Sequence, residues 1–149
     1  MDFKTRTWIL PSERTKNGKP HIVHLSEPAI AVLKEMKKEG EYVFSTSGKI
    51  RFQAFSTAKR ELDEASGVTG WRLHDLRRTC VSGMARLGVP PHVADKILNH
   101  QAGTISGVAA VYQRHDFLSE RRDALNRWGA HVTQIVRQSL RHGMILKAA

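Results

Sequence analysis

The chain has 149 residues, a length that favours one domain, and its hydrophobic content of 40% is typical of a globular protein. No apolar run approaches the ~20 residues of a membrane-spanning helix, and charges on both sides of the first apolar residues exclude a signal peptide. With 24 Lys and Arg against 14 Asp and Glu, the net charge is +10, which favours a polyanionic partner, DNA or RNA before a membrane. A single cysteine, Cys80, excludes an internal disulfide and is typical of the cytoplasm.

The first elements along the chain are predicted to form a β-hairpin. Residues 7–11 (TWILP) and 21–25 (HIVHL) are rich in side chains that favour strands. The Asn17-Gly18 pair between them is a strong hairpin signal, typical of a turn in which both residues take positive φ. We therefore expect two antiparallel strands at the start of the chain.

Helices are predicted after the hairpin. Ser26 is the expected N-cap of the first, with Pro28 in its first turn, and apolar residues at helical spacing continue it to Gly40. Residues 42–45 are a candidate short strand. The order of elements predicts an α+β fold, mainly α, in which a small antiparallel β-hairpin is followed by a helical bundle. The further helices are expected from about Phe52 to near Gly67, from about Leu76 to Leu87 before Gly88, and over residues 91–98, 105–112 and 118–137.

The segment WRLHDLRRTC seats His74, Arg77 and Arg78 where a helix begins. One interpretation is a solvated basic turn whose side chains pair with Asp75 or Asp63. The other is a phosphate site, because the N–H groups of a helix start are unpaired and the helix dipole favours an anion. On this segment alone, the structural interpretation carries more weight.

Three other residues are also ambiguous when each is taken alone. His100 ends a short helix, where histidine often serves only as a C-terminal cap. Tyr112 lies among AAVYQ, where a half-buried packing role is common. Lys16 precedes Asn-Gly, where a solvated turn residue is the ordinary case. None of the three identifies a function by itself.

Together, these segments resemble a known family. In chain order, HDLRRT, LNH and AAVYQRHDF resemble the C-terminal active-site boxes of the tyrosine recombinase (phage integrase) family. The upstream ERTKNGKPHIVHLS resembles the lysine-bearing β-hairpin of the same family. The resemblance covers residues 8–128, which is most of the chain.

The resemblance implies a catalytic set for cutting DNA. Tyr112 is the implied nucleophile, which forms a 3′-phosphotyrosine, and Lys16 is the implied general acid. Lys19 is an alternative to Lys16 because it lies in the same loop. The residues implied to contact the scissile phosphate are His74, Arg77 and His100.

The resemblance also implies the partners. They are double-stranded DNA at an attachment site and further copies of the protein, with a tetramer on DNA for the intact recombinase. No cofactor and no metal are implied, and the sequence lacks the carboxylate cluster of a two-metal nuclease. No membrane is expected, and the expected compartment is the cytoplasm. Candidate DNA contacts are Lys19, Arg72, Arg78 and Arg114.

Two features depart from the family pattern. The family carries a further arginine in an earlier box resembling TGxRxxE, and nothing before Lys16 matches it. We therefore expect residues 1–149 to be a single, partial catalytic domain of a longer integrase. The alternative is a DNA-binding remnant without catalysis. Asn99 stands where the family often has glycine, and asparagine tolerates the left-handed conformation that a glycine there would adopt.

Two alternatives concern other parts of the chain. The helix at residues 118–137, with Trp128, Val132 and Ile135 on one face, fits packing on its own domain and docking on a neighbouring protomer equally well. A zinc site is disfavoured, because His21 and His24 are expected to point to opposite faces of a strand and no cysteine cluster completes a site.

Overall fold

The computed structural model describes residues 1–36, 40–45, 48–100 and 115–148, with the side chains of 142–148 outside the description. Its backbone divides into two compact units, which are described one at a time. Unit 1 comprises Met1–Ile30 and Val81–Ala149, and unit 2 comprises Ala31–Cys80. Helices dominate the described residues, and the sheet among them has two antiparallel strands, so the predicted α+β, mainly α class is confirmed. None of the described helices combines the length and the apolar character needed to cross a membrane.

The predicted hairpin is present in unit 1. Strand β1 (Thr7–Leu10) pairs antiparallel with β2 (His21–His24). The connection holds a 3₁₀ turn, η1 (Ser12–Arg14), and the N–H of Gly18 donates to the carbonyl of Thr15 at 3.2 Å. Gly18 has a φ of 64°, but Asn17 does not have positive φ, so the predicted turn type is wrong. A loop over residues 11–20 is long enough to reverse the chain with one left-handed residue, and the two-residue turn is not needed.

Helix α1 (Glu27–Glu35) begins where the sequence predicts and ends early. The N–H of Ile30 donates to the carbonyl of Ser26 at 2.9 Å, which agrees with Ser26 as the residue before the helix. The helix stops at Glu35 and does not reach Gly40. The candidate strand at residues 42–45 is also absent. A strand needs a partner along its length, and among the described residues the backbone bond found for this segment runs from Phe52 N–H to Phe44 O at 2.9 Å.

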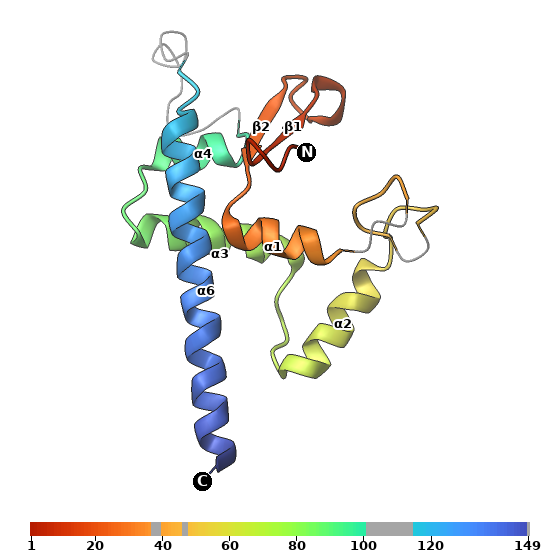
Figure 1. Ribbon diagram of the computed structural model, residues 1–149, viewed down its shortest axis with the longest axis vertical. Coiled ribbons are helices and arrows are strands. Elements are labelled where there is room, and N and C mark those ends of the chain that lie inside the picture. Colours follow the sequence, from red (N-terminus) through yellow and green to blue (C-terminus); the bar gives the residue numbers. More distant parts are fainter. Residues whose placement is uncertain (37–39, 46–47, 101–114, 149) are drawn as a thin grey trace. The chain divides into compact units, whose positions relative to one another are not determined.

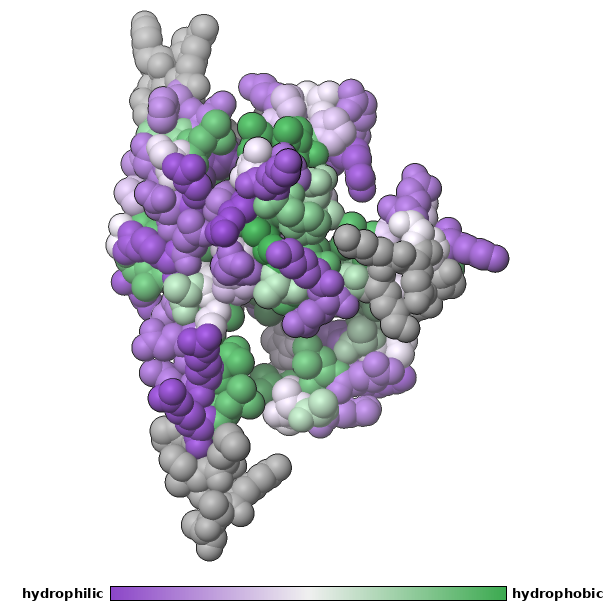
Figure 2. Space-filling view, viewed as in Figure 1, coloured by the Kyte–Doolittle hydropathy of each residue, from purple (hydrophilic) through white to green (hydrophobic). Residues whose placement is uncertain are grey.

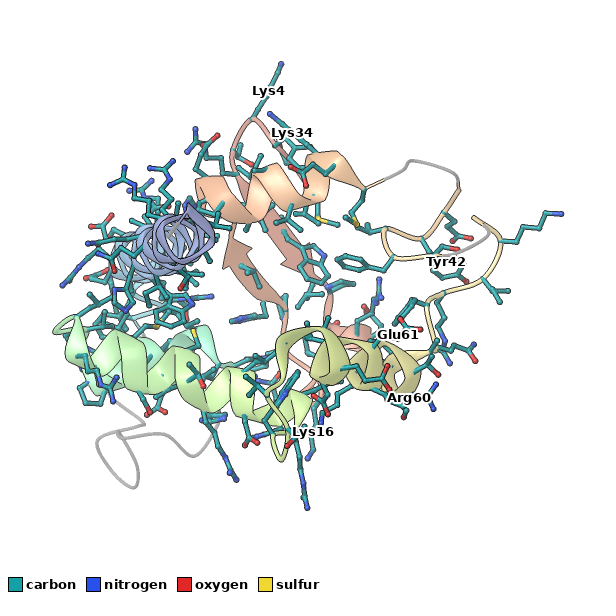
Figure 3. All side chains as sticks on the ribbon, turned by 90° about the horizontal axis from the view of Figure 1, so that it is seen from below. Lys4, Lys16, Lys34, Tyr42, Arg60 and Glu61 are labelled. Carbon is teal, nitrogen blue, oxygen red and sulfur yellow. The ribbon has the colours of Figure 1, made fainter. Side chains whose placement is uncertain are left out.

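Unit 2 contains α2 (Phe55–Ser66) and the start of α3 (Leu73–Arg86). Gly67 ends α2 in the left-handed region, as predicted, and its N–H donates to the carbonyl of Asp63 at 2.9 Å. Arg60 and Glu61 are carried on the same helix (Figure 3). None of the described hydrophobic side chains of this unit is fully buried. Its stability therefore depends on half-buried contacts, such as the Lys59 ammonium 5.1 Å from the centre of the Trp71 ring.

The apolar core of the described residues lies in unit 1. Helix α4 (Pro91–Ile97) packs on α6 (Leu118–Ala148), near the start of the long blue helix in Figure 1. Both helices begin where the sequence predicts, and α6 extends beyond Arg137. The helix predicted at residues 105–112 falls outside the described residues. The buried hydrophobic side chains are Leu25, Ile30, Met84, Val89, Val93, Ala94 and Ala124.

Helix α6 packs on its own unit over its first half. A Cβ built on Gly83 of α3 would lie 2.1 Å from Cζ3 of Trp128, so the indole ring sits against the glycine backbone. Further along, Val132 and Ile135 are 38% and 47% exposed. Hydrophobic surface flanks this second half of the helix in Figure 2. Packing on its own domain is therefore confirmed for Trp128, while the apolar face beyond it is uncovered.

Candidate active site

The loop between β1 and β2 carries the candidate general acid in unit 1. Lys16 is exposed (Figure 3), inside the turn that the Gly18-to-Thr15 bond closes. The Thr15 hydroxyl lies 2.9 Å from the carbonyl oxygen of Ser12 and 2.7 Å from that of Lys19. Internal hydrogen bonds thus give the loop a defined shape around an exposed lysine. Lys19, the alternative acid, is also exposed.

His100 follows the C-terminus of α4, also in unit 1. Asn99 has a φ of 56°, and the N–H of His100 donates to the carbonyl of Asp95 at 3.1 Å, an arrangement that satisfies a free carbonyl at the helix end. Asn99 thus adopts the left-handed conformation that asparagine tolerates. The capping role considered for His100 is present in its backbone. Its ring is not consumed by that role, because Nδ1 lies 3.5 Å from Oδ1 of Asp95 and the side chain is 47% exposed.

A side-chain hydrogen bond brings these two segments together. Nδ2 of Asn17 donates to Oδ1 of Asn99 at 2.8 Å, across 82 residues of sequence. Asn17 follows Lys16, and Asn99 precedes His100. Two of the predicted catalytic residues therefore each lie one residue from a shared contact.

His74 and Arg77 lie at the start of α3, in unit 2. They are three residues apart on a helix, so they share one face, and both are exposed. Asp75 contacts Arg72 and Arg78. Its Oδ2 accepts from the N–H of Arg72 at 2.9 Å, and its Oδ1 accepts from Nη1 of Arg78 at 3.2 Å. This carboxylate caps the start of α3. The pairing with Asp75 that was considered for the basic turn is therefore present, with Arg78 as the partner.

Some of the remaining predicted residues lie among the described residues, and others lie outside them. Asp63, the other carboxylate considered for the basic turn, forms an ion pair with Lys59. Arg72 and Arg78 are exposed at the start of α3. Tyr112 and Arg114 lie outside the described residues.

A buried cluster in unit 1 was not predicted. Arg121 is 6% exposed and donates to the carbonyls of Ile22 and, at 3.3 Å, Asp116. Nη2 of Arg121 lies 3.5 Å from Nδ1 of His21, and the His21 ring also bonds the Ile97 carbonyl. This cluster ties the hairpin to α4 and α6. Arg121 lies in the run SERRD, where an arginine is ordinarily solvated, so the sequence carries no signal for its burial.

The two histidines of β2 have separate partners. Nε2 of His24 lies 3.2 Å from Oδ1 of Asn126, whereas His21 contacts Arg121. Within the residues that the structure describes, no group of three or more His, Cys, Asp and Glu side chains is arranged to hold a metal ion.

Burial, and then the positive charge of Arg121, lower the pKa of His21 below its ordinary value of 6.5. The unfolded chain therefore takes up a proton at a higher pH than the folded chain. The free energy of unfolding is expected to fall as the pH drops below 6.5, until His21 is protonated in the folded state too.

The His21→Gln variant is expected to lose less stability than the unchanged chain when the pH falls from 7.5 to 5.5, because glutamine does not titrate. Urea unfolding at the two pH values measures the difference. His24→Gln, on the same strand, is the control and should keep the original pH dependence. If the pH dependence of His21→Gln equals that of the unchanged chain, His21 is not the titrating group.

Comparisons with known proteins give one family and one curated relative. A family model described as the phage integrase family matches residues 1–118. Among curated proteins, the chain is 29% identical over 132 residues to "Prophage integrase IntA" of Escherichia coli (strain K12). The match covers 86% of this chain and 32% of that protein, so the chain spans about a third of the relative's length. No solved structure matches at a significant level.

Proposed function

This chain belongs to the phage integrase family, and we propose that residues 1–149 act as a partial catalytic domain of a site-specific DNA recombinase. In this proposal the chain contributes to cleaving and rejoining DNA through a 3′-phosphotyrosine. The observation that carries the proposal is the family match over residues 1–118, because it contains every implied catalytic residue in the family's order. Those residues are Lys16, His74, Arg77, His100 and Tyr112.

The cations of the set neutralise the phosphate. A phosphodiester is an anion that repels nucleophiles, so cleavage requires donors on its non-bridging oxygens. Arg77 supplies a planar fork of N–H groups that stays charged, and His74 lies one turn away on the same face of α3. His100 supplies a further donor, and its neighbour Asp95 faces Nδ1, which leaves Nε2 for the phosphate. These hydrogen bonds strengthen as the oxygens gain charge in the transition state.

The nucleophile and the acid complete the step. The phenolate of Tyr112, after loss of its proton to solvent, attacks the phosphorus and forms the new P–O bond. The bond from phosphorus to the 5′-oxygen breaks, and Lys16 donates a proton to that oxygen. General-acid help of this kind is typically worth about 10²–10⁴-fold. Rejoining is the same step in reverse, so the phosphotyrosine conserves the bond energy of the DNA backbone.

The partner in this proposal is double-stranded DNA, and the compartment is the cytoplasm. The charge of +10 supports a polyanionic partner, and Lys19, Arg72, Arg78 and Arg114 are the proposed backbone contacts. Arg78 suits this role because its side chain is 75% exposed, and its Nη1 lies 3.2 Å from Oδ1 of Asp75.

Covalent capture tests the proposal without knowledge of the target sequence. The chain, and any longer integrase that contains it, is expressed in cells and the lysate is denatured, so that only covalently attached DNA is retained. Peptide mass spectrometry should then find a phosphotyrosine-linked nucleotide at Tyr112. DNA that binds reversibly, with log K falling by about 0.9 for each phosphate neutralised as log[salt] rises, but never covalently, would support the alternative of a DNA-binding remnant. If the chain binds DNA neither covalently nor reversibly, both the recombinase proposal and the DNA-binding alternative are overturned.

The second half of α6 supports the proposal of a homo-oligomer on DNA. Val132, Ile135, Val136 and Leu140 are between 38% and 63% exposed and lie on one face. A second copy of the chain docked on this face would remove these apolar side chains from water. Ile135→Asp is expected to lower the mass of the protein–DNA complex measured by light scattering, whereas Gln134→Asp, which adds the same charge on the opposite side, should not. Equal masses for both variants would exclude this face from the assembly.

A further inference from the structure

The Asn17–Asn99 hydrogen bond joins two segments that the chain keeps 82 residues apart. On one side it ends at the residue after Lys16, and on the other at the residue before His100. Successive Cα atoms are only about 3.8 Å apart, so a contact at these two asparagines restrains both neighbours. We propose that Asn17 and Asn99 are positioning residues, which hold the Lys16 loop against the His100 segment so that both act on one phosphate. This inference rests on the proposed function for its catalytic part.

Asn99 is better explained by its side chain than by its backbone. With a φ of 56°, the position is one that glycine adopts without strain, whereas a non-glycine residue there is uncommon. Asparagine is tolerated, but it gains nothing over glycine in ending the helix. What its side chain adds is the oxygen that accepts from Asn17 at 2.8 Å. The tie to the lysine loop is therefore the function that we assign to this side chain.

Asn17 fixes the loop from its own side. Its Oδ1 accepts from the backbone N–H of Lys19 at 3.1 Å, while its Nδ2 donates to Asn99. One amide thus shapes the turn that carries Lys16 and connects that turn to the end of α4. A lysine has a long, rotatable side chain, so a fixed backbone beneath it limits the volume that its ammonium searches.

A crosslinking rate tests the geometry without any DNA. The background is Cys80→Ser, because Cys80 is the chain's single cysteine. Lys16→Cys and His100→Cys are then added, and the rate of closure by a short bismaleimide is measured. Asn99→Gly keeps the left-handed backbone and removes the acceptor, so closure is expected to slow by about fivefold, the factor for one ordinary hydrogen bond. Asn99→Asp keeps an acceptor oxygen and is the matched control, with an unchanged rate expected.

Asn17→Ala should slow closure at least as much as Asn99→Gly, because it also removes the acceptor for the Lys19 N–H. The double variant Asn17→Ala/Asn99→Gly should be no slower than Asn17→Ala alone, because the bond to Asn99 is already lost. A rate that Asn99→Gly leaves unchanged, in a chain that unfolds at the same urea concentration as its parent, would overturn the positioning role.

A sulfur leaving group tests the catalytic part. In DNA whose scissile 5′-oxygen is replaced by sulfur, the thiolate leaves without a proton, so the general acid is not needed. Asn99→Gly, in the protein that forms the adduct, should slow cleavage of ordinary DNA by about fivefold and leave cleavage of the sulfur substrate unchanged. Glycine keeps the left-handed backbone beside His100, so the variant loses only the tie to the Lys16 loop. Equal slowing of both substrates would refute the connection to Lys16. If no variant cleaves either substrate, the proposed function fails, and crosslinking alone still decides whether the two asparagines hold the segments together.

Discussion

Tyr112→Phe is expected to abolish covalent attachment to DNA while DNA affinity stays unchanged. The substitution removes one oxygen, the proposed nucleophile, and keeps the aromatic ring, so the volume of the side chain changes little. Loss of the attacking nucleophile lowers the rate by at least about 10³-fold. The measurement is the amount of protein that remains on labelled DNA after denaturation, together with reversible binding of the same DNA at one fixed salt concentration.

The chain supplies its own control, because it contains two tyrosines. Tyr42 is 40% exposed in unit 2. Tyr42→Phe should leave the covalent adduct at its original level. An adduct that survives Tyr112→Phe and disappears in Tyr42→Phe would move the nucleophile to Tyr42. One that survives both would show that a different residue attacks the phosphate.

Local signals in the sequence predicted the elements of the fold. Gly67 and Gly88 both take positive φ, and each ends a helix where the sequence predicted. The strands of the hairpin were predicted because β-prone runs flank Asn17-Gly18, even though the turn type was wrong. The predicted strand at residues 42–45 is absent from the structure. Its side chains favour a strand, but strand formation depends on a neighbour that a local pattern cannot report.

Long-range contacts in the candidate site could not be predicted in this way. The roles of Lys16 and His100 came from a family resemblance, but the hydrogen bond that connects their neighbours spans 82 residues. Arg121 and His21 are 100 residues apart, and arginine is a type that is mostly exposed while histidine is intermediate. Burial of these groups depends on how β2 and α6 pack, which periodicity within either element does not encode.

Gly83→Ala is expected to destabilise unit 1, although alanine is the better helix former. The added Cβ would lie 2.1 Å from Cζ3 and 2.8 Å from Cη2 of Trp128, both atoms of a rigid ring. Overpacking of this kind costs about 1–3 kcal/mol, whereas the gain in helix propensity is at most about 1 kcal/mol. We expect the free energy of unfolding to fall by about 1–2 kcal/mol in urea titrations. Ser82→Ala, at an exposed position of the same helix, should change it by less than about 0.5 kcal/mol.

The Trp128→Leu background separates the contact from the backbone. Leucine lacks the ring that meets the new Cβ, so the same Gly83→Ala change should now stabilise the chain by up to about 1 kcal/mol, the propensity term alone. The sign of the effect therefore reverses between the two backgrounds, although Trp128→Leu itself costs stability. A loss that stays the same in both backgrounds would mean that the glycine is needed for its conformation. The contact between α6 and α3 through Trp128 would then not be the reason that residue 83 must be glycine.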